Sequence, residues 1–194
     1  MNYPFELKFK VLAIAQQLWV RDSHGMVVSY IKQKAFKWKE SVTIFADESQ
    51  TRPLYHINAD RVIDFNAKYY FTDVQGAPIG SVRRQGMKSM WKTTMEVMYQ
   101  DSVVMTITET NPWAKVLDAL MTEIPVVGIF SGYFFHPKYL LARTDGSPVL
   151  QLTKEPAFFE SRFKLEQVGA MQPHEETLGL LAFFMTVLLA RSRG

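Results

Sequence analysis

The feature that most restricts the fold is a short apolar run near the C-terminus, residues 178–190. Glu175 and Glu176 precede it, and Arg191 and Arg193 follow it. Acidic residues at the start and basic residues at the end suit the dipole of a helix, so the sequence predicts a helix over residues 174–192. Its large apolar side chains surround the helix instead of forming a stripe. Every face of this helix must therefore be buried.

Two environments could bury such a helix. A bilayer is one, but about 13 apolar residues at 1.5 Å each reach only about 20 Å, against a hydrocarbon core of about 30 Å. The other is the protein itself, because a closed barrel of antiparallel strands needs side chains or a central helix to fill it. The length favours the second environment, so we expect the helix to be the core of a barrel.

A strand pattern that occurs three times predicts the wall of this barrel. The copies cover residues 18–31, 69–82 and 139–152, and each has an apolar strand, a turn with Asp and Gly, and a second apolar strand. Asp accepts hydrogen bonds from the backbone two residues further on, and Gly takes the positive φ of a tight turn. Each copy therefore predicts a β-hairpin, followed by a basic stretch and an aromatic strand.

Further strands and one short helix are expected between these hairpins. Residues 162–166 alternate polar and apolar side chains, as a half-buried strand does, and residues 42–45, 94–98 and 103–108 are similar. The total of roughly ten to twelve strands favours a mainly β fold, a barrel around the C-terminal helix. Asn111-Pro112 and the apolar spacing after it predict a short amphipathic helix near 112–121.

Composition sets the class of protein. The 194 residues contain no Pro/Gly/Ser-rich linker, so we expect a single domain over residues 1–194. The absence of cysteine excludes disulfides, thiolate nucleophiles and cysteine-ligated metals, and it favours a cytoplasmic setting. The four histidines are far apart in the sequence and form no metal-binding motif. No catalytic residue, metal site or cofactor is therefore predicted.

Two basic stretches are the candidate ligand-binding residues. They are Lys32, Lys34, Lys37 and Lys39 after the first hairpin, and Arg83, Arg84, Lys88 and Lys92 after the second. If the barrel brings these side chains together, they form a cationic rim able to hold a phosphate group or an anionic lipid surface. The alternative is a solvated strand edge that its lysines protect from aggregation. The net charge of +3 permits an anionic partner but falls short of a nucleic-acid-binding composition.

The repeated hairpins and the apolar tail together resemble the tubby C-terminal-like superfamily, which includes phospholipid scramblases. Residues 30–37 and 156–160 more closely resemble bacterial LURP-one-related proteins. The resemblance implies a twelve-stranded barrel with the last helix threaded through it. Tubby proteins bind phosphoinositide head groups through basic residues, but no binding residue can be carried over to a position of this sequence.

Three functions follow as expectations. The first is a non-enzymatic binding or scaffold protein, cytoplasmic or peripheral at the membrane, that recognises an anionic phospholipid or another phosphate-bearing ligand. The second is a membrane-tethered lipid transporter that inserts the helix of residues 178–190. The third is an enzyme of unrecognised type, which would need a deep pocket that gathers His136 or Asp101 with other polar groups.

Overall fold

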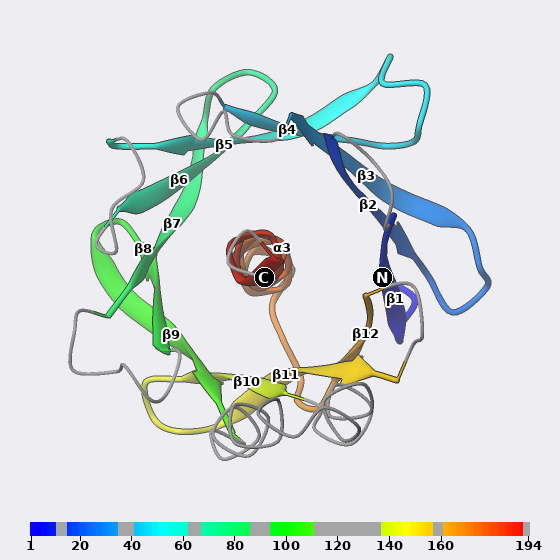
Figure 1. The fold of residues 1–194 in the computed structure, drawn as a ribbon. Coiled ribbons are helices and arrows are strands. Elements are labelled where there is room, and N and C mark those ends of the chain that lie inside the picture. The colour runs from blue at the N-terminus through cyan, green and yellow to red at the C-terminus, as the bar shows by residue number, and fades with distance from the viewer. Residues whose placement is uncertain are drawn as a thin grey trace, which may run out of the picture.

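The computed structural model describes residues 1–10, 15–34, 41–61, 67–85, 94–110, 137–156 and 161–191. Twelve antiparallel strands form a closed barrel around one helix, α3 (Pro173–Arg191) (Figure 1). The strands are β1 (Phe5–Phe9), β2 (Ala15–Arg21), β3 (Val27–Lys34), β4 (Val42–Phe45), β5 (Pro53–Ala59), β6 (Lys68–Asp73), β7 (Pro78–Arg84), β8 (Thr94–Tyr99), β9 (Ser102–Glu109), β10 (Lys138–Arg143), β11 (Pro148–Glu155) and β12 (Arg162–Gln167). The predicted barrel with a central helix is confirmed.

The order of strands around the barrel is the order in the chain, and β1 pairs with β12 to close it. Consecutive connections therefore alternate between its two ends. We call the end where α3 begins the entry end; it carries the β2–β3, β4–β5, β6–β7, β8–β9 and β10–β11 turns. The opposite end, which holds the other connections and the last residues of α3, is the exit end.

The tripled hairpin is confirmed as β2–β3, β6–β7 and β10–β11. Each copy has a register shift just before the turn, and each turn closes with the same pair of backbone hydrogen bonds. The fourth turn residue is a glycine with φ between 78° and 86° at Gly25, Gly76 and Gly146. This conformation is costly for other residues, which explains the glycine in every copy.

The turns differ in which side chain supports them. Asp22 and Asp73 start their turns, and each carboxylate accepts two backbone N–H bonds across the turn. In the third copy Arg143 occupies that first position, while Asp145 lies two residues later and accepts the N–H of Ser147 at 2.8 Å. Asp145 is therefore not the structural equivalent of Asp22 and Asp73, because it lies two positions later in its turn.

The side chain of Arg143 binds the first turn of α3. Its Nε and Nη2 donate to the two carboxylate oxygens of Glu175 at 2.8 and 2.9 Å, and Nη2 also donates to the carbonyl of Ala170 at 2.7 Å. Glu175 additionally accepts the backbone N–H of Gln172, the residue before Pro173. A proline in the first helical position and an acid that reaches back to the capping residue are typical of a helix start.

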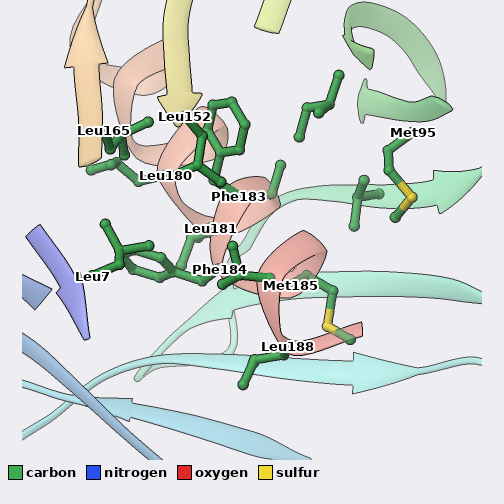
Figure 2. Packing of buried hydrophobic residues seen from close by; sticks show 14 of the residues in the cluster. Leu7, Met95, Leu152, Leu165, Leu180, Leu181, Phe183, Phe184, Met185 and Leu188 are labelled. Atoms are coloured by element: carbon green, nitrogen blue, oxygen red, sulfur yellow. The ribbon is translucent and has the colours of Figure 1, made fainter. Parts of the chain in front are cut away.

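The body of α3 is the core of the barrel. Every residue from Leu178 to Leu188 is buried. Figure 2 shows side chains that leave the helix in different directions, those of Leu180, Leu181, Phe183, Phe184, Met185 and Leu188. A Cβ on Gly179 would lie 2.8 Å from a methyl carbon of Leu141, so the glycine permits close approach of the helix to β10. The structure thus confirms that this helix is enclosed by the protein.

Two other expectations have different outcomes. The predicted helix near 112–121 lies outside the described residues. In the part of the chain that the structure describes, no helix is long and apolar enough to cross a membrane. A single domain over residues 1–194 stays a prediction.

Candidate functional site

The predicted basic residues on described strands lie toward the exit end. Lys32 and Lys34 are among the last three residues of β3, and Arg83 and Arg84 are the last two residues of β7. The side chain of Lys32 is exposed, and that of Lys34 is not among those described. Four further candidates, Lys37, Lys39, Lys88 and Lys92, lie outside the described residues.

Arg83 faces outward and belongs to a network of charges. Its Nε donates to the Glu96 carboxylate on β8 at 2.6 Å, and it lies opposite Lys68 on β6. The ammonium of Lys68 donates to Asp101 at 2.7 Å, and this bond raises the pKa of Lys68 although burial and the charge of Arg83 lower it. Asp101 is thus engaged by a lysine on the barrel surface, not gathered into a polar pocket.

Arg84 has a different orientation from its neighbour. It lies opposite Met95, whose side chain is buried in the barrel, so Arg84 is on the inward face of β7. Lys154 of β11 lies opposite the buried Phe163 and shares this inward orientation. Half-buried cations therefore face the interior near the exit end, in addition to those on the outside.

The two basic stretches do not form one cluster. Lys32 on β3 and Arg83 on β7 are separated by β4, β5 and β6. Four strand steps at about 4.8 Å each place them about 19 Å apart around the wall. The repeat itself causes this separation, because successive hairpins recur every four strands of a twelve-stranded barrel.

Both basic stretches belong to a larger asymmetry of charge between the two ends of the barrel, which was not predicted from the sequence. We assigned each charged residue that the structure describes to the end of the barrel nearer to it. Positive and negative charges then separate along the barrel axis. The exit end holds Lys8, Lys10, Lys32, Arg61, Arg83, Arg84, Lys138 and Lys154, with the acids Asp60, Glu96, Glu109 and Glu155. The entry end holds Asp22, Asp47, Glu48, Asp73, Asp145, Glu175 and Glu176, with the cations Arg21, Arg52 and Arg143. The ion pairs Lys68–Asp101, Arg162–Glu6 and Lys164–Glu166 join the two halves of the wall and are counted with neither end.

The sequence did contain a signal for this segregation. Aspartates at the hairpin turns were predicted, and in an up-and-down barrel all such turns lie at one end. The strand order is the further information needed to predict that acidic residues gather at one end, and the strand order cannot be read from the sequence.

A cavity of about 260 Å³ lies at the entry end, between α3 and the wall. Its wall comes from the N-terminal residues, β1, β2, β3, β5 and one face of α3. The helix contributes Leu180, Leu181 and Phe184, and the strands contribute mainly apolar side chains such as Val20 and Leu54.

The cavity has a cause in the pairing of the wall. In the part of the chain that the structure describes, β3 pairs with β4 only at Tyr30↔Phe45 and Ile31↔Ile44. Toward the entry end, residues 27–29 continue to pair with β2 but not with β4. The wall therefore separates beside Val28 and Ser29, and side chains do not fill the space between this gap and α3.

Five polar side chains line this space, those of Asn2, Asp22, Ser29, Tyr55 and Thr177. Ser29 lies opposite the buried Val20 and Tyr55 lies opposite the buried Ile44, so both point inward. Asp22 is 9% exposed and also lines the cavity.

Asp22 is the acidic side chain among the lining residues, and an ion pair of the N-terminus lies at one of the others. Burial alone would raise the pKa of Asp22, but hydrogen bonds from the backbone of Met26 and His24 and from Asn2 lower the pKa. The N-terminal ammonium of Met1, a residue that lines the cavity, lies 3.7 Å from Glu176. Burial and the Glu176 charge raise the pKa of Tyr3.

Metal-binding groups are not assembled in the described part of the chain, where no three His, Asp or Glu side chains are placed to hold an ion. His24 is in the first turn, His56 bonds with Thr43 at 3.2 Å, and His174 lies beside Tyr99. His136 lies outside the described residues.

The architecture defines a class: an up-and-down barrel of twelve antiparallel strands filled by its own C-terminal helix, with opposite charge at its two ends. The family model of LURP-one-related proteins matches residues 27–124, which is half of the chain. The chain belongs to the LURP-one-related family. No curated protein and no solved structure matches the sequence.

Proposed function

We propose that this protein is a non-enzymatic binding protein that recognises an anionic phospholipid surface, or another phosphate-bearing ligand, with the exit end of its barrel. The observation that carries the proposal is the segregation of charge along the barrel axis. A cationic end attracts phosphate groups, and the acidic entry end orients the molecule by repelling the same surface.

The arrangement suits a broad surface better than one small anion. Lys32 and Lys138 are exposed on β3 and β10, and Arg83 on β7 lies between them in the strand order on one side. Such separated cations can each contact a different head group of a membrane. A single phosphate, in contrast, needs several donors within hydrogen-bond distance of one point.

Flotation with vesicles tests the proposal. We expect recovery with vesicles that contain phosphatidylserine, and none with pure phosphatidylcholine. The double variant Lys32→Glu/Lys138→Glu should weaken binding about thirtyfold or more, because each basic residue near an anionic surface contributes about 1 kcal/mol. Binding should also fall steeply between low and physiological salt.

The matched control reverses two cations at the other end. Arg21→Glu/Arg52→Glu changes the net charge by the same amount, but both residues lie at the entry end. We expect this control to bind the anionic vesicles as the unmodified protein does. Equal losses in both double variants would show a response to net charge alone, and equal recovery with neutral and anionic vesicles would eliminate the lipid version.

A further inference from the structure

The geometry points to a second binding site at the opposite end of the barrel: the entry-end cavity between α3 and β3 takes up a small uncharged apolar molecule that carries a hydroxyl or similar hydrogen-bonding group. This site is independent of the cationic exit end. It can therefore be correct or wrong whatever the outcome of the vesicle experiment.

The size of the cavity sets the size of the ligand. Its volume of about 260 Å³ exceeds the roughly 150 Å³ of an apolar cavity that accepts benzene. At roughly 30 Å³ for each non-hydrogen atom, the share of a water molecule in the liquid, it holds a molecule of about nine such atoms. The ligand is thus a medium-length alkyl chain or a small ring system, not a complete phospholipid.

The wall determines the chemistry of the ligand body. Leu180, Leu181 and Phe184 line the cavity from α3, and Val20 and Leu54 line it from the strands. Water in such a space finds few hydrogen-bonding partners, so an apolar molecule replaces it favourably.

The polar groups determine the other end of the ligand. The side chains of Ser29 and Tyr55 face inward from β3 and β5, and both line the cavity. Each can donate to or accept from a ligand hydroxyl. A ligand that places its apolar body against α3 can therefore direct its polar end to these two hydroxyls.

The charge around the cavity excludes anions. Asp22 lines the wall and is 9% exposed, and the N-terminal ammonium of Met1, another lining residue, has Glu176 as its partner at 3.7 Å. A carboxylate or phosphate in the cavity would lie close to Asp22 in a partly desolvated space, where like charges repel strongly. The ligand is consequently neutral, unlike the proposed ligand of the exit end.

Titration with 1-octanol and octanoate tests the site, since the two probes share a chain length and differ in charge. We expect calorimetry to show one molecule of 1-octanol bound per chain, and octanoate to bind at least tenfold more weakly. In methyl NMR spectra, 1-octanol should shift the signals of Val20, Val28, Leu54 and Leu180. The absence of octanol binding, equal binding of octanoate, or shifts spread over the exit end would each overturn the inference.

Variants that fill the cavity make the test specific. Ser29→Leu and Leu54→Trp add volume from two different strands, and both should abolish octanol binding while the chain stays folded by circular dichroism. Ser102→Leu is the control, because Ser102 is exposed at the entry end of β9 and does not line the cavity. Should one filling variant fail to fold, the other decides, and retained octanol binding in a folded filling variant contradicts the site.

Discussion

The ion pair between Arg143 and Glu175 should be a major contributor to the stability of the barrel. It joins the third hairpin to the start of α3 through two hydrogen bonds, at 2.8 and 2.9 Å. The two side chains are 29% and 18% exposed, so solvent screens the pair only in part. Neutralising one partner by Glu175→Gln keeps the shape of the side chain and removes its charge.

The pKa of Glu175 gives the magnitude. The hydrogen bonds from Arg143 lower it from 4.5 to about 2, although burial opposes the change. At about 1.4 kcal/mol per pKa unit, this shift corresponds to at most about 3 kcal/mol of folding free energy. Partial exposure and the bonds that glutamine retains reduce the expected loss for Glu175→Gln to about 2 kcal/mol.

The pH dependence follows from the direction of the shift. Because the folded-state pKa lies below the unfolded value, the Glu175 carboxylate stabilises the fold above a pH of about 4.5. The contribution decreases as the pH falls toward about 2, where the folded state also binds the proton. The difference between the original protein and Glu175→Gln should therefore shrink over this range.

Urea unfolding at a series of pH values measures this difference. Glu166→Gln is the matched control, because Glu166 pairs with Lys164 on the surface at 37% and 41% exposure, and such pairs contribute about 0–1 kcal/mol. A difference for Glu175→Gln that stays constant with pH, or one no larger than that of Glu166→Gln, would refute the role assigned to Arg143.

Two further predictions concern the core. Deletion of the chain from His174 onward should abolish the folded state, because α3 fills the barrel; a truncated chain with a cooperative thermal transition would contradict this. Gly80→Ala should destabilise the protein by about 2–3 kcal/mol, because a Cβ there would lie 2.6 Å from the Met98 carbonyl oxygen and 2.7 Å from Leu178 at a φ of 154°. Gly76→Ala, in open space at a φ of 85°, should cost only about 1 kcal/mol in the same denaturant experiment.

The sequence predicted the wall and the core because their signals are local. An apolar segment with no polar face requires enclosure, and an aspartate and a glycine at fixed spacing require a turn. In the third hairpin, the local pattern predicts the turn but not the role of each residue in it. Asp145 and Gly146 predicted the turn correctly, but only the backbone hydrogen bonds show that Arg143 occupies the place of Asp22 and is free to hold α3.

The candidate sites depended on relations that a linear sequence does not contain. The proximity of Lys32 and Arg83 depends on the number of strands between them, and the inward orientation of Arg84 depends on its pairing with Met95. The entry-end cavity depends on the short ladder between β3 and β4. Each is a consequence of register and closure, which are set by the whole barrel.

Part of the charge segregation follows from the fold alone. Aspartates support the entry-end turns, and Glu175 and Glu176 suit the positive end of the α3 dipole. The cations of the exit end have no equivalent structural requirement, since exposed strand residues such as Lys32 and Lys138 support neither a turn nor a helix start. Protection of an open strand edge does not account for Lys138, because β10 pairs with both β9 and β11. The excess of positive charge at that end, among the described residues, is therefore the part of the pattern on which the proposed recognition of an anionic partner depends.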